Sequence, residues 1–194
     1  DAARPRAGAF LDACLSERVP LSGDRVGGVD ASMLCGLGLH EGDVVAYVAQ
    51  TGAPNAPAGF RTARRVLELA ERLRIPVLTL IDTPGAANDA EAERQGVGTA
   101  IAELFATVAS LTVPATSVVI GEGGSGGALA LAAPGRLYAA PDSFFAVIAP
   151  EAAAAILHRD RSRAREVAEL LALRPCDLVR LGIVRPATPG DGGD

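Results

Sequence analysis

Residues 115–132, ATSVVIGEGGSGGALALA, contain the junction that decides the fold. The apolar run at 115–120 predicts a strand buried on both faces, the glycine-rich stretch 121–127 predicts a tight connection, and the alanines and leucines beyond it predict a helix. A second apolar run at 76–81 ends in the turn 82–85 (DTPG) and also precedes a helix. Because ligands of such sheets bind beyond the carboxyl ends of the strands, we expect both turns to lie together at one functional end.

Outward from these junctions, the hydrophobic pattern alternates between strand and helix. Residues 31–50 predict a β-hairpin around the turn 41–43 (EGD). The other expected elements are helices near 10–15, 60–73, 101–111, 151–158 and 163–173 and short strands at 136–140 and 144–148. This order predicts an α/β protein. We expect one domain over 1–194, with loose ends at 1–7 and 186–194.

Composition excludes several classes of function. All 18 basic residues are Arg, so the chain has no Lys for a Walker A loop or for Schiff-base catalysis. The net charge of -5 argues against a nucleic-acid partner, and no apolar run is long enough to span a membrane. The three Cys are far apart in sequence, which favours a reduced, cytoplasmic protein without a metal site. We expect all three, Cys14, Cys35 and Cys176, to be buried small hydrophobes.

The glycine-rich stretch allows three interpretations. The spacing Gly121-x-Gly123-x-x-Gly126 fits a dinucleotide fingerprint, but Glu122 would place a carboxylate beside the pyrophosphate. The spacing Gly123-x-Ser125-x-Gly127 fits the nucleophile elbow of a serine hydrolase, for which His158 would have to be the base. In the third interpretation the backbone N–H groups at the helix start form an oxyanion hole, and the glycines let a substrate approach them.

Several stretches, in one order, resemble a known family. GEGGSGGALALA (121–132), IDTPGA (81–86) and AEAERQGVGTAIAE (90–103) look like signatures of the α subunit of bacterial acetyl-CoA carboxylase carboxyltransferase. Further similarity lies in LSGDR (21–25), AGFRTARRVLELAERLRIPVLTL (58–80), VIAPEAAAAILHRD (147–160) and LGIV (181–184).

The resemblance implies a crotonase-like (ClpP/crotonase) fold, a spiral of ββα units. It implies a transferase of fatty acid biosynthesis that moves a carboxyl group from carboxybiotin to acetyl-CoA or another short acyl-CoA, giving malonyl-CoA or a homologue. Carboxybiotin would arrive on a biotin carboxyl carrier protein. A homologous carboxyltransferase β subunit would complete the hetero-oligomer, with the α-type chain mainly on the biotin side.

The resemblance also implies the site residues. Two sets of N–H donors are expected to stabilise the thioester enolate and the biotin ureido oxygen, and no metal or side-chain base is needed. The expected catalytic donors are Gly85, Ala86, Gly126 and Gly127. The residues expected to bind biotin or substrate are Ala87, Gly123, Gly124, Ser125 and Ile148.

Some segments depart from the family pattern. The loop 51–57 lacks the basic residues expected there, residues 87–89 replace an aromatic and a Pro-Gly pair, and Ala152 follows Glu151 where the family has glycine. These changes leave open a different acyl substrate, a decarboxylase-like activity, or a non-catalytic scaffold subunit. At the start of the first turn, we expect Asp82 to fix its own turn by an Asx-type hydrogen bond. The arginines at 159, 161, 163 and 165 are expected to form a solvated face, with a phosphate contact as the alternative.

Overall fold

A computed structural model describes residues 4–133 and 135–186, and the central feature is a seven-stranded sheet. Along the sheet the strand order is β1-β2-β3-β4-β5-β6, and β7 pairs with the end of β5. The strands are β1 (Arg18–Pro20), β2 (Met33–His40), β3 (Asp43–Gln50), β4 (Val77–Thr83), β5 (Ala115–Gly124), β6 (Leu137–Ala139) and β7 (Phe144–Ala146). From β3 onward all neighbours run parallel, so the α/β prediction is confirmed.

The predicted hairpin is the antiparallel pair β2 and β3. Its register places His40 opposite Asp43, which leaves a two-residue turn at Glu41 and Gly42. Both turn residues have positive φ, 52° and 93°, as the turn that matches strand twist requires.

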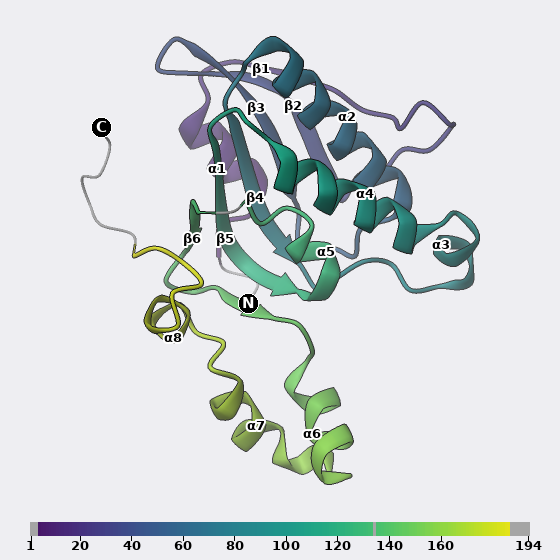
Figure 1. Ribbon diagram of the computed structural model, residues 1–194, viewed down its shortest axis with the longest axis vertical. Coiled ribbons are helices and arrows are strands. Elements are labelled where there is room, and N and C mark those ends of the chain that lie inside the picture. The colour runs from purple at the N-terminus through teal and green to yellow at the C-terminus, as the bar shows by residue number, and fades with distance from the viewer. Residues whose placement is uncertain (1–3, 134, 187–194) are drawn as a thin grey trace.

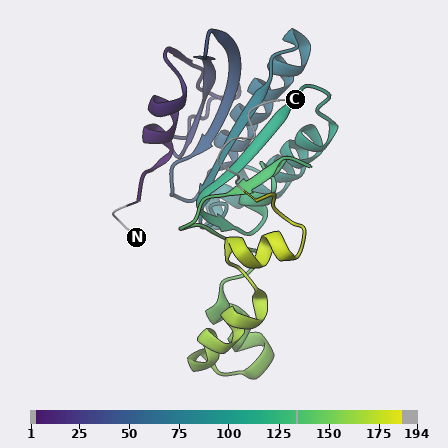
Figure 2. The same cartoon turned by 90° about the vertical axis from the view of Figure 1, so that its left-hand side faces the viewer.

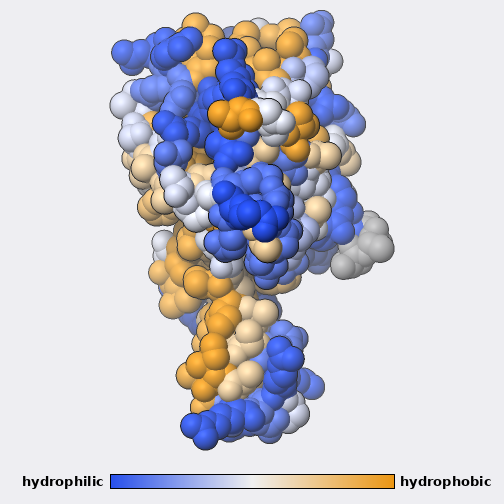
Figure 3. Space-filling model, turned by 90° about the vertical axis from the view of Figure 1, so that its right-hand side faces the viewer, coloured by the Kyte–Doolittle hydropathy of each residue, from blue (hydrophilic) through white to orange (hydrophobic). Residues whose placement is uncertain are grey.

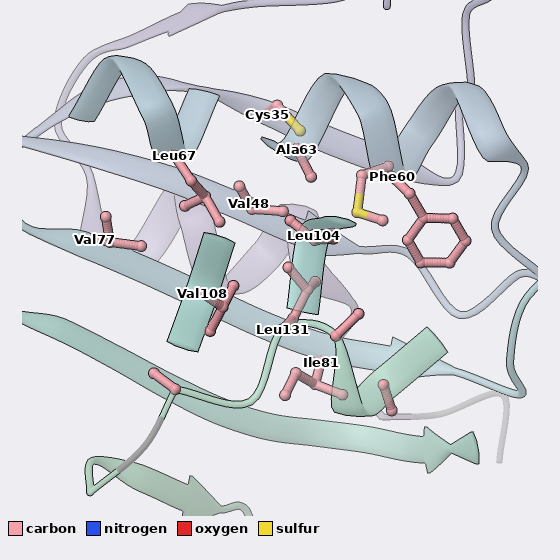
Figure 4. Close-up of a cluster of buried hydrophobic side chains, with 14 of the residues drawn as sticks. Cys35, Val48, Phe60, Ala63, Leu67, Val77, Ile81, Leu104, Val108 and Leu131 are labelled. Carbon is pink, nitrogen blue, oxygen red and sulfur yellow. The ribbon is translucent and has the colours of Figure 1, made fainter. Parts of the chain in front are cut away.

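Helices cover both faces of the sheet (Figure 1). The amphipathic helices α2 (Pro57–Leu73) and α4 (Val97–Ser110) lie on one face, and α1 (Ala7–Cys14) lies on the other, as the turned view in Figure 2 shows. Between the sheet and α2 and α4 is a hydrophobic core that includes Phe60, Leu67, Ile81 and Leu104 (Figure 4). Residues of α1 pack on Tyr47 and Leu80 of the opposite face.

The strand predicted at 115–120 is longer than expected, because it runs through the first glycines to Gly124. The residues Glu122–Gly124 pair with β7, a strand that comes later in the chain, and Gly123 also lies opposite Thr83 of β4. These partners supply the ladder hydrogen bonds that local sequence does not reveal. The helix α5 (Ser125–Leu129) follows at once.

Beyond β7 the chain forms a helical arm that projects from the end of the sheet (Figure 1). The arm consists of α6 (Pro150–His158), the short η1 (Arg161–Arg163) and α7 (Ala164–Leu171), and α8 (Pro175–Arg180) leads back toward the sheet. Ala153, Ala154 and Val167 form a small core of its own. Exposed apolar side chains gather along the arm (Figure 3).

Two short helices and one strand, α3 (Ala90–Arg94), α8 and β1, were not predicted, since five, six and three residues carry too little periodicity. The helix α3 begins at Asp89, whose carboxylate accepts hydrogen bonds from the N–H groups of Glu91 and Ala92. No helix in the described ranges is long and apolar enough to cross a bilayer.

The expectation of a loose end at 1–7 is wrong for residues 4–7. Arg4 and Arg6 both form ion pairs with Asp82, and Ala7 is fully buried as the first residue of α1. Residues 1–3 and 187–194, the rest of the predicted loose ends except Pro186, lie outside the described residues.

The expectation for the cysteines is correct only for Cys35. That residue is buried in the sheet, whereas Cys14 and Cys176 are exposed near helix ends. Burial raises the pKa of the Cys35 thiol to about 12, so it stays protonated and unreactive at neutral pH.

Candidate active site

The two turns predicted to lie together are in direct backbone contact. A Cβ atom built on Gly124 would lie 2.3 Å from the Pro84 carbonyl oxygen, and one built on Gly127 would lie 2.9 Å from the Ala86 nitrogen. Neither distance is possible for a real side chain. Glycine at these two positions therefore lets the end of β4 touch the start of α5.

The turn after β4, residues 83–87, is held by hydrogen bonds from buried polar groups. The Thr83 hydroxyl accepts from the Gly85 N–H at 3.1 Å, and the Asn55 N–H donates to the Gly85 oxygen at 3.1 Å. The Ala87 N–H donates to the Asn55 oxygen at 2.8 Å. Of the three residues predicted in this turn, Gly85 and Ala87 thus have engaged N–H groups, and the N–H of Ala86 finds no acceptor among the described residues.

The turn after β5 places backbone donors at the start of α5. Ser125 has φ of 52°, an uncommon conformation for a residue with a side chain, and this lets the chain change from strand to helix in one step. Gly126 and Gly127 follow in the first helical turn, where an α-helix offers no acceptor for their N–H groups. The predicted residue Gly123 faces Phe145 of β7, so its role includes strand packing.

Gly126 differs from the neighbouring glycines. A Cβ atom there would meet only the Ile101 side chain, at 3.8 Å, which is ordinary contact. Packing does not explain why this residue is glycine. Its open surface beside the N–H group fits the predicted role in substrate approach.

A buried amide network connects the two turns, and the sequence did not point to it. The Gln50 Nε2 donates to the Gly127 oxygen at 2.9 Å and to the Asn55 Oδ1 at 2.8 Å. The Asn55 Nδ2 donates to the Ser32 oxygen at 3.1 Å and to its hydroxyl at 2.8 Å. Gln50 and Asn55 have no exposed surface. A polar residue at the carboxyl end of the strand β3 is the one signal that could have suggested it.

Asp82 was expected to fix its own turn, and this is wrong. Its side chain points to the opposite face of the sheet, where it is fully buried and accepts two hydrogen bonds from Arg4 at 2.7 Å each and one from Arg6 at 3.0 Å. The Glu122 N–H also donates to it. Burial acts to raise the pKa of Asp82, but these hydrogen bonds outweigh it, so the pKa lies below its ordinary value.

A cleft of about 550 Å³ lies beside these turns, between the end of β5 and the helical arm. Three of the predicted residues line it: Gly124, Ser125 and Ile148. The other predicted residues, Gly85, Ala86, Ala87, Gly123, Gly126 and Gly127, do not line it. Sequence reasoning missed five lining residues, because they come from β7, α6, α7 and the connection after α7, which all follow the two turns in the chain. These residues are Phe144, Glu151, Glu169, Leu173 and Arg174.

The arginine cluster divides between the two expected roles. Arg163 pairs with Glu166 on the exposed arm, as a solvated face would. Arg165 lines the cleft, although it also lies 3.7 Å from Glu169.

The serine-hydrolase interpretation lacks its base. His158 contacts Arg163 through Nδ1 at the far end of α6, and His40 contacts the Cys14 carbonyl at the hairpin turn. Neither histidine lines the cleft that contains Ser125. The elbow-like conformation of Ser125 is therefore present without the residue that would activate its hydroxyl.

Comparison with curated relatives gives consistent results. The chain is 41% identical over 196 residues to the acetyl-coenzyme A carboxylase carboxyl transferase subunits beta/alpha of Saccharopolyspora erythraea, covering 95% of this chain and 34% of that protein. It is 40% identical over 199 residues to the subunit alpha of Aquifex aeolicus, covering 96% of this chain and 61% of the relative. The chain thus spans about three fifths or less of the length of these relatives.

Comparison with solved structures confirms the expected crotonase-like fold. A transcarboxylase 12S structure with methylmalonyl-coenzyme A and methylmalonic acid bound has a TM-score of 0.81 and 19% identity, covering 94% of this chain and 38% of the other. The beta subunit of Pseudomonas aeruginosa geranyl-CoA carboxylase has a TM-score of 0.73 and 23% identity, covering 87% and 35%.

The family itself is settled by a match along almost the whole chain. Residues 1–189 match the family model described as acetyl co-enzyme A carboxylase carboxyltransferase-like. The motifs quoted from the sequence, the crotonase-like fold and the identity to the curated relatives agree with this match. The chain therefore belongs to the acetyl-CoA carboxylase carboxyltransferase-like family, and the two curated relatives named above are a subunit alpha and a protein described as subunits beta/alpha.

Proposed function

We propose that this chain forms the α-type half of a biotin-dependent acyl-CoA carboxyltransferase, and that a homologous β-type chain completes the active site. The observation that carries the proposal is the contact between two strand-end turns that offer the backbone N–H groups of Ala86, Gly126 and Gly127. Such donors stabilise negative oxygens, and the removal of a single one typically costs about 3 kcal/mol of transition-state stabilisation.

We propose that the backbone donors at the start of α5 bind the carbonyl oxygen of the biotin ureido group. The surface beside Gly126 is open, and its N–H group precedes the first intrahelical hydrogen bond. Carboxybiotin, carried on a separate protein, would supply the carboxyl group. In our proposal Gly126 and Gly127 donate hydrogen bonds to one negative oxygen, and Ala86 donates to another. No Lys or His of this chain acts as a base.

The cleft beside Ser125 and Ile148 is the proposed place for substrate. Its walls are mainly apolar around Phe144 and Leu173. The charged residues that line it are Arg165, Arg174, Glu122, Glu151 and Glu169. Acetyl-CoA or another short acyl-CoA is the substrate class, and malonyl-CoA or a homologue is the product.

The test is reconstitution with a β-type chain. We expect malonyl-CoA to form from acetyl-CoA and the carboxylated biotin carrier, measured by mass spectrometry. Gly126→Val should lower the rate at least about 100-fold without loss of folding, because the added side chain covers the donors. Gly98→Val is the matched control, since Gly98 is also the second residue of a helix, has nothing within 4 Å of its Cβ position, and belongs to neither turn.

Other results would contradict the proposal. Unchanged activity in Gly126→Val would show that the proposed N–H donors do not act in the reaction. If no short acyl-CoA gives a product, the chain is not part of a carboxyltransferase. A stable complex whose activity survives changes in both turns would indicate a scaffold subunit. Covalent labelling by a fluorophosphonate that is lost in Ser125→Ala would indicate a hydrolase.

A further inference from the structure

Gln50 lies at the carboxyl end of β3 and belongs to neither of the two turns. Its side chain is fully buried on the sheet face that α2 and α4 cover, because alternate residues Ala46 and Val48 of β3 belong to that core. The nearest polar groups are the Gly127 carbonyl and the Asn55 Oδ1, 2.9 and 2.8 Å from Gln50 Nε2.

Both of these neighbours are acceptors, and this determines what group can stand between them. An amide NH₂ has two hydrogens and can serve both acceptors at once. If the Gln50 amide were rotated by 180°, Oε1 would face two acceptors and repel both. The two neighbouring acceptors therefore set the orientation of this amide. Gln50 Oε1 is buried without a partner among the described residues, which indicates that the amide is kept for its two donors.

One acceptor belongs to the turn after β5, and the other is on a residue that bonds to the turn after β4. The Gly127 carbonyl is part of the first turn of α5. The backbone of Asn55 bonds to the other turn. Its N–H donates to the Gly85 oxygen, and its carbonyl oxygen accepts from the Ala87 N–H. A continuous path of hydrogen bonds thus runs from the start of α5 through Gln50 and Asn55 to residues 85–87.

We propose that Gln50 is a positioning residue that sets the separation between the N–H groups of Gly126 and Gly127 and that of Ala86. The inference rests on the proposed carboxyltransferase function, in which both donor sets act together. Oxyanion donors must be placed within a fraction of an ångström, and a displacement of about 1 Å can cost about 100-fold in rate. The glycines between the turns make contact but form no directional bond, whereas Gln50 does.

The sharpest test replaces Gln50 by Glu, which has nearly the same size. A protonated carboxyl group offers one O–H in place of two N–H groups, and a carboxylate offers none and would face two acceptors. Burial raises the pKa of such a group. Along the network the next carboxylate is Asp30, which accepts from Ser32 and from the Ala56 N–H, while Asp82 points to the other face of the sheet toward Arg4.

We therefore expect kcat of Gln50→Glu relative to wild type to fall about 100-fold at about pH 8 and to recover partly at about pH 6, with KM for the acyl-CoA nearly unchanged. Gln95→Glu makes the same chemical change at an exposed residue that bonds to Glu91, and its relative kcat should equal wild type at both pH values. Thermal unfolding at both pH values shows that the variants are folded. Gln50→Met, which is apolar and of similar size, should lower kcat equally at both pH values.

Hydrogen exchange separates this inference from the proposed function. If wild type with its β-type partner forms no product, the carboxyltransferase proposal fails, but faster exchange of segments 83–87 and 125–129 in folded Gln50→Met would still support positioning. Wild-type exchange in both segments would overturn the inference. Wild-type kcat in folded Gln50→Glu at about pH 8, or in Gln50→Met, would also overturn it.

Discussion

The turns after β4 and β5 lie against each other, yet they are held in different ways. The turn at 83–87 depends on hydrogen bonds, because the Thr83 hydroxyl and the backbone of Asn55 bond to the backbone groups of Gly85 and Ala87. The turn at 121–127 depends on missing side chains, because Gly124 and Gly127 allow backbone contact that no Cβ permits. Substitutions should therefore act by steric overlap in the second turn and by lost hydrogen bonds in the first.

The largest effect should come from Gly124→Val. Its Cβ would overlap the backbone oxygen and carbon of Pro84, at 2.3 and 2.4 Å, and a backbone cannot rotate away as a side chain can. We expect the free energy of unfolding to fall by about 3 kcal/mol or more, measured by urea denaturation. Wild-type stability would show that the two turns separate easily and that the contact is not needed.

Asp82→Asn should have the next largest effect, because the carboxylate holds Arg4 and Arg6 beside both strand ends. Removal of one partner of a buried ion pair lowers the free energy of unfolding by about 3 kcal/mol. Asp43→Asn, at the exposed end of the hairpin, is the control and should lower it far less.

The stabilisation from Asp82 should also depend on pH. Since the folded-state pKa lies below the ordinary value of 3.8, the stabilisation is fully present above about pH 4 and is lost as pH falls through the folded pKa. Denaturation curves from neutral pH down to about pH 2 should show this loss in wild type and a smaller one in Asp82→Asn. Equal pH dependence in both proteins would contradict the assignment.

Thr83→Val tests whether the hydrogen bonds of the Thr83 hydroxyl hold the first turn. The substitution keeps the shape but leaves the Gly85 N–H without its acceptor, which should cost about 1–2 kcal/mol. Thr107→Val on the exposed face of α4 is the control, with an expected change within about 0.5 kcal/mol. Equal effects at both positions would mean that the hydroxyl does not hold the turn.

The smallest effect on stability should come from Gly126→Ala, which separates packing from function within the second turn. The added methyl has space, and alanine in a helix is favoured over glycine by about 0.5–1 kcal/mol, so stability should stay equal or rise, as in Gly98→Ala. The carboxyl-transfer rate should nevertheless fall. A loss of stability like that of Gly124→Val would show that Gly126 is also needed for packing.

Local pattern predicted the parts of the molecule whose physical cause is local. The parallel strands, the hairpin turn with its two positive φ values, and the helices α2, α4 and α6 follow from periodicity, glycine and proline placement. The extension of β5 to Gly124 was missed, because its partner strand β7 comes later in the chain. The fixed position of Arg4 and Arg6 was missed for the same reason, since Asp82 lies more than 70 residues away.

The sequence by itself predicted that two strand-end turns, the second of them rich in glycine, lie together, and its motifs indicated the family that the comparisons confirm. Only the tertiary structure decided which glycines are needed for packing and which one has room for a side chain, because that depends on what lies opposite each Cβ position. It also decided that Gln50 and Asn55 join the turns. Hydrogen bonds between distant segments depend on strand order and register, and one residue type at one position does not specify these.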